Sequence, residues 1–259
     1  MNYPQIKSTL FKALREAGSL MKEAIDRPKD IQKKSELSLV TETDCACEKA
    51  IIAAVQKDFP DHAFLTEESP AFGNSPSRWI VDPVDGTTNF AHGYPVSCVS
   101  IGFEHEGVVR MGGVYDPFRD ELFFAEKGKG AFKNDKPIRV SQVKKLSESL
   151  IATGFPYDVR ENADYYLATF KDFLMTTQGI RRAGAAAIDL CYVACGRYDA
   201  FYEKNLQPWD KAAGMLIVEE AGGRVTNYTG KPLGLNDHGN LATNGLLHAE
   251  MIEILKKTT

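Results

Sequence analysis

The sequence predicts a layered α/β fold of the α+β kind, in which helices cover β-sheets. Three observations predict it. Helical patterns fill most of the first 57 residues, strand patterns replace them between Trp79 and Ile138, and strands and helices alternate after residue 145. The change near residue 140 further predicts two subdomains, residues 1–140 and 141–259, that pack into one unit. A chain of 259 residues is long enough to bury such a core.

The amino-terminal part predicts two helices. The first covers residues 6–25, where apolar side chains recur at steps of three and four. The segment from Arg27 to Ser38 is charged, contains a proline and is expected to form a loop. The second helix runs from about Thr41 to Lys57, and Thr41 with Asp44 resembles a capping box at its start. Its apolar stripe consists of Cys47, Ile51, Ala54 and Val55.

The middle of the chain predicts neighbouring strands. A short apolar run at residues 79–81 stops at Asp82, and further strands are predicted at residues 96–103, 108–115 and 121–125. The last two strands are joined through Asp116-Pro117, which is typical of a hairpin turn.

The carboxyl-terminal part predicts strands and helices in alternation. Strands are predicted at residues 150–153 and 199–202, and helices at about 162–176, 185–195 and 210–221. Gly222-Gly223 suits a left-handed cap at the end of the last of these helices.

Composition excludes several classes of partner. A formal net charge of −4 argues against a nucleic acid or an anionic membrane bound through global electrostatics. The longest nearly apolar stretch, residues 183–196, is too short to span a membrane and contains Asp189. The amino terminus lacks a secretory pattern, and the five cysteines form no CxxC pair, so we expect reduced thiols and a cytoplasmic location.

The strongest local signal for chemistry is residues 79–90, Trp-Ile-Val-Asp-Pro-Val-Asp-Gly-Thr-Thr-Asn-Phe. The proline forces Asp82 toward extended geometry, so Asp82 and Asp85 are expected to aim at one point beyond the strand, which the Val84 carbonyl also faces. Magnesium prefers such oxygen ligands. Gly86 permits close approach of a ligand, and the following amides could donate to phosphate oxygens. A surface turn is the alternative, but two unpaired charges at a buried strand end would be costly.

Two other acidic segments are uninformative alone. Glu67 and Glu68 follow a short apolar run, and such adjacent glutamates are usually solvated. Asp210 follows Trp209 at the start of a predicted helix, where an aspartate is more often a cap than a metal ligand.

In combination, these segments resemble the inositol monophosphatase family over nearly the whole chain. The resemblance rests on residues 79–90 and on Trp209-Asp210-x-Ala-Ala-Gly, with support from residues 39–44, 66–69 and 184–187. It implies a layered α/β/α/β/α sandwich of the inositol monophosphatase and fructose-1,6-bisphosphatase type. It also implies a homodimer that lithium inhibits.

The resemblance further implies a role for particular residues. Metal ligands for roughly two or three Mg²⁺ ions per active site would be Glu67, Asp82, Asp85 and Asp210, with the Val84 carbonyl. Gly86 and Thr87 match the phosphate cradle. Thr87 and Asp44 match the pair that positions and deprotonates the attacking water, so the expected catalytic residues are Asp44, Thr87 and Glu67. The substrate would be bound by Asp85, Gly86, Thr87, Gly184, Ala185, Ala186, Glu203 and Asp210.

The implied activity is Mg²⁺-dependent hydrolysis of a small phosphate monoester by an activated water. Asp-Gly-Thr-Thr-Asn is more similar to the inositol monophosphatase form than to the Asp-Gly-Thr-Lys form of nucleotide bisphosphatase relatives. The expected partner is therefore a small phosphorylated polyol or sugar, with inositol monophosphate first. Fructose 1,6-bisphosphate, NADP and other sugar phosphates stay open as alternatives.

Three departures from the family pattern bear on the substrate. Ser38 stands where relatives often have aspartate, and Ala185 replaces a hydroxyl residue of some relatives. The lysine of the family's mobile loop could be Lys33 or Lys34.

Two rival functions have their own signatures. Phosphatases with an aspartate nucleophile use Asp-x-Asp, whereas Asp82 and Asp85 are one residue further apart. A non-catalytic metal-binding regulatory module would bind Mg²⁺ and turn over no phosphate ester. The motifs GxxxxGK[ST], HExxH and GxSxG are missing from the sequence.

Overall fold

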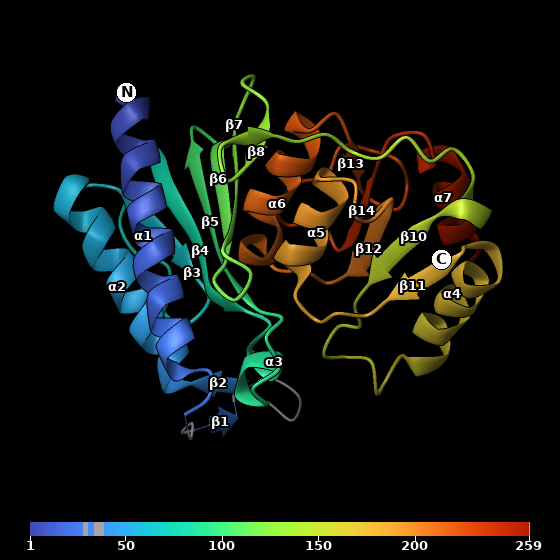
Figure 1. Cartoon of the computed structure of the whole chain (residues 1–259), viewed down its shortest axis with the longest axis horizontal. Coiled ribbons are helices and arrows are strands. Elements are labelled where there is room, and N and C mark those ends of the chain that lie inside the picture. The colour runs from blue at the N-terminus through green and yellow to red at the C-terminus, as the bar shows by residue number, and fades with distance from the viewer. Residues whose placement is uncertain (28–30, 34–38, 259) are drawn as a thin grey trace.

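The computed structural model of the chain describes residues 1–27, 31–33 and 39–258 (Figure 1). Within those residues the strands form three sheets: a seven-stranded one ordered β3-β4-β5-β6-β7-β8-β9, a five-stranded one ordered β11-β10-β12-β14-β13, and the pair β1-β2. We refer to them as the large sheet, the small sheet and the hairpin. The hairpin consists of β1 (Ile31–Lys33) and β2 (Leu39–Thr41).

The large sheet is antiparallel except at one edge, where β3 pairs with β4 in parallel. Its strands are β3 (Ala63–Thr66), β4 (Ser77–Asp85), β5 (Cys98–His105), β6 (Val108–Asp116), β7 (Glu121–Glu126), β8 (Ala131–Lys133) and β9 (Lys136–Pro137). The small sheet is mixed, with β10 parallel to both β11 and β12. Its strands are β10 (Leu150–Thr153), β11 (Gly179–Arg181), β12 (Ala200–Lys204), β13 (Arg224–Thr226) and β14 (Gly239–Thr243).

Helices fill three layers around the two sheets, as Figure 1 shows. The helices are α1 (Tyr3–Ala24), α2 (Glu42–Asp58), α3 (Thr87–Ala91), α4 (Ala163–Thr176), α5 (Ala186–Ala194), α6 (Pro208–Glu220) and α7 (His248–Leu255), with 3-10 turns at Leu146–Glu148 and Lys256–Thr258. α1 and α2 pack on the large sheet, α5 and α6 lie between the two sheets, and α4 and α7 lie outside the small sheet. The predicted layered α/β/α/β/α architecture is confirmed.

Two adjacent glycines of β6 explain how closely helices approach both faces of the large sheet. Successive residues of a strand point to opposite faces. A Cβ on Gly113 would lie 2.6 Å from Leu14 Cδ1 of α1, and a Cβ on Gly112 would lie 2.8 Å from the Cα of Ala213 in α6. Both helices therefore pack directly on the backbone of β6. On the predicted apolar side of α1, the fully buried residues include Ile6, Leu10, Leu14, Ala17 and Met21.

Several element boundaries differ from the predicted ones. β4 does not stop at Asp82 but continues to Asp85, and residues 31–33 form a strand inside the predicted loop. β11, β13, β14 and α7 had no prediction. The thiols are free as expected, although Cys45 is exposed. Ser38 and Lys34 lie outside the described residues. Of the two lysines that could belong to the family's mobile loop, the structure therefore places only Lys33, at the end of β1. Among the described residues, no helix is long and apolar enough to cross a membrane.

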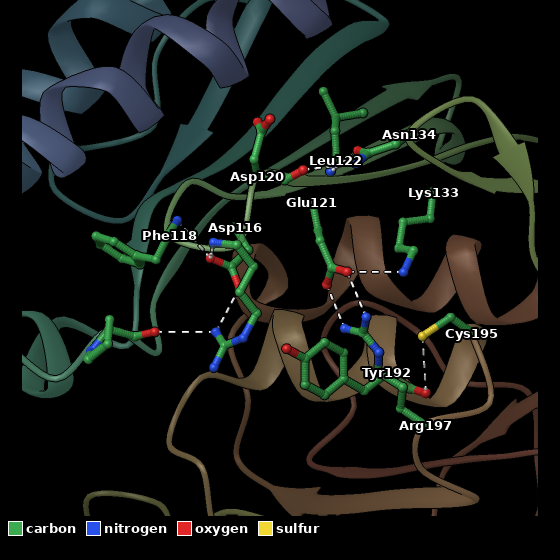
Figure 2. Close-up of polar contacts among 12 residues, drawn as sticks. Asp116, Phe118, Asp120, Glu121, Leu122, Lys133, Asn134, Tyr192, Cys195 and Arg197 are labelled. Atoms are coloured by element: carbon green, nitrogen blue, oxygen red, sulfur yellow. Dashed lines mark hydrogen bonds and ion pairs between the residues drawn. The ribbon is translucent and has the colours of Figure 1, made fainter.

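A charged cluster joins the large sheet to the middle helical layer (Figure 2). Glu121 of β7 accepts two hydrogen bonds from the Arg197 guanidinium, at 2.5 and 2.6 Å, and one from Lys133 Nζ at 3.0 Å. The same guanidinium lies over the ring of Tyr192 in α5, 4.7 Å from its centroid. Hydrogen bonds to Arg197 first, and then to Lys133, lower the pKa of Glu121. The cluster therefore ties residues of the two predicted subdomains together at the rim of their contact.

His248, the first residue of α7, is buried between β13 and β14. Its two ring nitrogens lie 2.9 Å from Thr226 Oγ1 and 2.9 Å from Thr243 Oγ1. Burial, and then the nearby Arg224, lower the pKa of His248 from 6.5 to about 4. In the unfolded chain, the imidazole of His248 becomes protonated near pH 6.5, whereas in the folded chain it becomes protonated only near pH 4. The contribution of neutral His248 to the free energy of unfolding is therefore fully present above about pH 6.5 and is lost as the pH falls toward 4.

This difference predicts an acid sensitivity that one substitution removes. Between pH 7 and pH 5, we expect the free energy of unfolding of the wild type to fall by about 2 kcal/mol more than that of His248→Gln. Urea unfolding at the two pH values measures it, with the exposed residue His92 changed to glutamine as the control. If wild type and His248→Gln lost stability equally, His248 would not be held neutral by the fold.

Candidate active site

A β-bulge in β4 brings the two aspartates of the main motif to one side of the large sheet. Asp82 pairs with Ser100 of β5 and Asp85 pairs with Cys98, so β4 has one extra residue between these pairs. In a regular strand, residues three apart point to opposite faces, and a bulge re-aims the side chains that follow it. Both aspartates are buried. The predicted strand end at Asp82 was wrong, because β4 continues through the bulge and ends at Asp85, so both aspartates belong to the strand.

The acidic side chains predicted as metal ligands influence one another electrostatically. Burial raises the pKa of Asp82 well above its usual value, and the charges of Glu67, Asp85 and Asp210 raise it further. Burial also raises the pKa of Asp85 to about 6, and that of Asp210 well above its usual value, with Asp85 as the leading charge on Asp210. Glu67, Asp82, Asp85 and Asp210 therefore lie close enough to influence one another's pKa, and a cation near them would relieve their repulsion.

Each aspartate also accepts hydrogen bonds from nearby backbone amides. Val84 N donates to Asp82 Oδ1 at 3.0 Å, Gln207 N donates to Asp210 Oδ2 at 2.7 Å, and the amides of Ala186 and Ala187 donate to Asp85. Among the residues that the structure describes, no three or more acidic, histidine or cysteine side chains are arranged so that together they could hold a metal ion. Mg²⁺ usually retains several waters beside one or two carboxylates, so a closed protein cage is not what this cation requires.

Asp44 and Thr87 form a buried pair beside the bulge. The capping box of α2 holds Asp44, which accepts from Thr41 N at 2.9 Å and from the Thr41 hydroxyl. Thr87 is the first residue of α3, and its Oγ1 lies 3.0 Å from Asp44 Oδ1 and 3.0 Å from the Val84 carbonyl oxygen. Burial raises the pKa of Asp44. A buried carboxylate with a raised pKa is thus within hydrogen-bond distance of the Thr87 hydroxyl at the start of α3.

Two residues predicted to bind the substrate, Asp85 and Gly86, contact the segment at the start of α5. Asp85 accepts from Ala186 N at 3.2 Å and from Ala187 N at 2.8 Å, so it caps this helix across the boundary between the sheets. Gly86 has φ of 87°, and a Cβ there would lie 3.1 Å from the Gly184 carbonyl oxygen and 3.2 Å from Ala185 Cβ. The phosphate-cradle glycine therefore touches the loop that precedes α5, and only glycine fits this contact.

Glu203 of β12 is half-buried over Gly154, where any Cβ would overlap its carboxylate. Burial raises the pKa of Glu203 to about 8, although the nearby Arg182 lowers it. A small hollow of about 10 Å³ beside Glu203 has aromatic walls that include Tyr165 and Tyr228. A larger hollow of about 250 Å³ lies elsewhere, and none of the predicted site residues lines it: its residues are Lys7, Phe11, Leu122, Phe124, Phe132 and Asp135.

Two side chains at the site had no predicted role. Asn89, in the main motif, reaches from α3 to the loop before α5, and its amide nitrogen lies 2.8 Å from the Ala183 carbonyl oxygen. Lys211, next to Asp210, is fully buried and donates to the Asp237 carbonyl oxygen at 2.7 Å. Their position inside the two motifs was visible in the sequence, but their partners lie 94 and 26 residues away along the chain.

Comparison with known proteins agrees with this geometry. The model of the "Inositol monophosphatase family" matches residues 2–259. The inositol-1-monophosphatase of Synechocystis sp. is 46% identical over 249 residues, which cover 95% of this chain and 87% of that protein. The Nus factor SuhB of Pseudomonas aeruginosa is 45% identical over 227 residues, covering 85% of this chain and 84% of that protein. The solved inositol monophosphatase of Anabaena (Nostoc) sp. superposes with a TM-score of 0.90 at 41% identity, covering 99% of this chain and 97% of that one. The chain therefore belongs to the inositol monophosphatase family.

Proposed function

We propose that this protein is a Mg²⁺-dependent phosphomonoesterase whose substrate is inositol monophosphate or a closely similar polyol phosphate. The observation that carries the proposal is the hydrogen bond of Thr87 to Asp44 beside the buried aspartates of β4. A hydroxyl and its carboxylate partner next to a cation-binding region are the groups that direct water attack on phosphorus requires.

The acidic side chains fit Mg²⁺ by their chemistry. Glu67, Asp82, Asp85 and Asp210 offer hard oxygen donors, with the Val84 carbonyl beside them. At an effective dielectric constant of about 20, two like charges roughly 4 Å apart repel by about 4 kcal/mol, and a divalent cation removes this cost. Bound Mg²⁺ would supply positive charge to the phosphate and to the attacking water.

Thr87 and Asp44 would move the proton of the attacking water. Thr87 Oγ1 takes up that proton as its own hydroxyl proton passes to Asp44 Oδ1, 3.0 Å away. The raised pKa of Asp44 suits a group that must hold a proton briefly. The water oxygen forms the new bond to phosphorus as the bond from phosphorus to the ester oxygen breaks. The ester oxygen takes a proton from solvent water and leaves as the free alcohol, so no covalent enzyme intermediate is required.

The alcohol part of the ester would lie against the start of α5. Gly184, Ala185 and Ala186 present backbone there, and the Glu203 carboxylate lies beyond them as an acceptor for hydroxyl groups. Ala185 contributes no hydroxyl of its own. This arrangement favours a small polyol over a bulky nucleotide. Fructose 1,6-bisphosphate, NADP and other sugar phosphates are the alternative substrates.

Phosphate release from a panel of esters tests the proposal. Purified protein is assayed with inositol monophosphate, fructose 1,6-bisphosphate and NADP, with Mg²⁺ or with a chelator, and with or without lithium. We expect the highest kcat/KM for inositol monophosphate, complete dependence on Mg²⁺, and inhibition by lithium. Binding of Mg²⁺ without turnover of any ester would instead identify a non-catalytic regulatory module.

Glu203 gives a sharper prediction about the substrate. Above pH 8, where Glu203 with its pKa of about 8 is charged, the Glu203→Gln variant removes the charge and keeps the shape, so KM for inositol monophosphate should rise roughly 10-fold as one charged hydrogen bond worth about 1.5 kcal/mol is lost. We expect kcat to change little, because this group would contact ground state and transition state alike. Steady-state kinetics measures both, with Glu104→Gln, distant in β5, as the control. A large fall in kcat at constant KM would rule out this role.

Three further properties are part of the proposal. Free thiols at all five cysteines favour a reducing compartment such as the cytoplasm. A net charge of −4 favours a small anion held by local cations over a nucleic acid held by a basic surface. As in the family at large, we expect a homodimer.

A further inference from the structure

Two loops from different sheets meet at the proposed site. We refer to residues 85–89, at the end of β4 and in α3, as the phosphate loop, and to residues 183–187, which lead into α5, as the substrate loop. Their backbones touch where Gly86 faces Gly184. Since the loops belong to opposite halves of the molecule, their relative position must be set by the contacts between them.

The side chain of Asn89 crosses this junction. Its Nδ2 donates to the carbonyl oxygens of Val96 and Ala183, both at 2.8 Å, and a third carbonyl, that of Gly184, lies at 3.4 Å. An amide group has two N–H donors, so the bonds to Val96 and Ala183 use both of them. Three carbonyl oxygens around one nitrogen also identify this end of the side chain as the donor.

The backbone of Asn89 orders the next segment as well. Its carbonyl oxygen accepts from Tyr94 N at 2.9 Å, and so the turn after α3 folds back over the same residue. Val96, which follows this turn, places its own carbonyl oxygen 2.9 Å from where a Cβ on Gly86 would be. Asn89 therefore holds three segments: α3, the turn that leads to β5, and the substrate loop.

On these contacts we propose that Asn89 is a positioning residue that fixes the substrate loop against the phosphate loop. This inference rests on the proposed phosphatase function for its consequence. Asp85 binds the amides of Ala186 and Ala187 at one end of the junction, and Asn89 binds Ala183 at the other. With both ends held, the loop that would contact the alcohol of the ester keeps its register with the loop that would contact the phosphate.

Loss of the Asn89 side chain should let the substrate loop shift relative to the phosphate loop. Asn89→Ala leaves the half-buried carbonyls of Val96 and Ala183 without their donor, so the substrate loop is free to shift toward water. Asn89→Asp keeps the shape but places a carboxylate against three carbonyl oxygens, which repels them. Both variants should displace the alcohol of a bound ester relative to its phosphorus, and a shift near 1 Å can lower the rate roughly 100-fold.

Two measurements on the full chain test the proposal. In steady-state kinetics by inositol release, we expect Asn89→Ala to lower kcat/KM for inositol monophosphate roughly 10- to 100-fold, through kcat as well as KM, while the inhibition constant of inorganic phosphate stays within about threefold. In hydrogen exchange, we expect the amides of Ala186 and Ala187 to exchange at least about tenfold faster than in the wild type. Asn89→Asp should behave like Asn89→Ala.

Asn244→Ala is the matched control. Asn244 is also an asparagine that bridges segments, donating to the Val143 carbonyl oxygen at 2.8 Å and to Ser141 Oγ at 3.0 Å, away from both loops. It should lower stability without changing KM or the exchange at Ala186.

Three outcomes would overturn the proposal. Unchanged exchange at Ala186 and Ala187 in Asn89→Ala is the first. The second is an equal change in KM for the ester and in the inhibition constant of phosphate, which would indicate a general loss of structure. The third is the same KM change in Asn244→Ala. If the wild type itself released no phosphate, the proposed function would fail, and hydrogen exchange would still decide whether Asn89 holds the loop.

Discussion

We expect the Asp82→Asn variant to lose phosphate release by at least about 10³-fold while it keeps the fold. Asp82 is buried in the bulge of β4, where the charges of Glu67, Asp85 and Asp210 are near enough to raise its pKa. The amide of asparagine has almost the volume of the carboxylate but no charge, so the packing of β4 should be preserved. What is lost is a hard anionic ligand for Mg²⁺.

The stability of this variant separates a ligand from a packing residue. Without Mg²⁺, we expect the Tm of Asp82→Asn to equal or exceed that of the wild type, because one member of a repelling group has become neutral. With Mg²⁺ at about 100 times its Kd, the wild type should gain about 2.7 kcal/mol, and the variant should gain much less. Thermal unfolding with and without Mg²⁺ measures both effects, alongside the phosphate-release assay.

Asp199→Asn is the control for loss of a buried carboxylate. Asp199 accepts from Leu150 N at 2.7 Å and from Ser141 Oγ at 2.5 Å, at the start of the small sheet rather than at the site. It should lower Tm and leave kcat/KM nearly unchanged. An Asp82→Asn protein that is folded and fully active would remove Asp82 from the proposed metal ligands.

The second large effect is expected at Thr87. Thr87→Ala removes the hydroxyl that binds Asp44, and we expect kcat to fall roughly 10²- to 10⁴-fold, the usual contribution of a positioned proton-transfer group. Thr87→Ser restores a hydroxyl at the same carbon and should regain most of the activity. Thr87→Val, which matches the shape of threonine without its hydroxyl, should be as inactive as Thr87→Ala.

A double-mutant cycle with Asp44→Asn shows whether the two residues act as one unit. If Thr87 works only through Asp44, the double variant should be about as slow as the slower single variant. Strictly additive losses would mean that Thr87 and Asp44 serve independent roles. Circular dichroism on all variants checks that the capping box of α2, which also uses Asp44, stays formed.

Helices and central strands were predictable because local signals there agree with the final packing. The capping box of Thr41 and Asp44 begins α2 as predicted, and the expected stripe Cys47, Ile51, Ala54 and Val55 is buried. The turn between β6 and β7 begins at Asp116, as predicted. Gly222, with φ of 88°, adopts the predicted left-handed conformation after α6.

Elements held mainly by tertiary pairing were missed. β13 and β11 have three residues each, too short for a periodic pattern, and they exist because β14 and β10 offer them ladder partners. The bulge of β4 could not be predicted from the motif alone, because a bulge is defined by how the residues of β4 pair with those of β5.

At the candidate site, the sequence proposes the residues but not the distances between them. The order of acidic segments indicated Glu67, Asp82, Asp85 and Asp210, but sequence spacing carries no information on which backbone amides each aspartate would accept. Asp44 was linked to Thr87 by family resemblance, and the structure places the pair 3.0 Å apart across 43 residues. Asn89 had no role in prediction because its partner Ala183 lies 94 residues away, in a loop of the small sheet.

A crystal structure of the protein with Mn²⁺ in place of Mg²⁺ and with inorganic phosphate tests the central claim most directly. Anomalous scattering locates the manganese without reference to any assumed site. We expect peaks within bonding distance of oxygens from Asp82, Asp85, Asp210 and Glu67, with phosphate between the metal and Gly86. Manganese bound elsewhere, or an occupied phosphate site with no metal among these carboxylates at saturating Mn²⁺, would contradict the account.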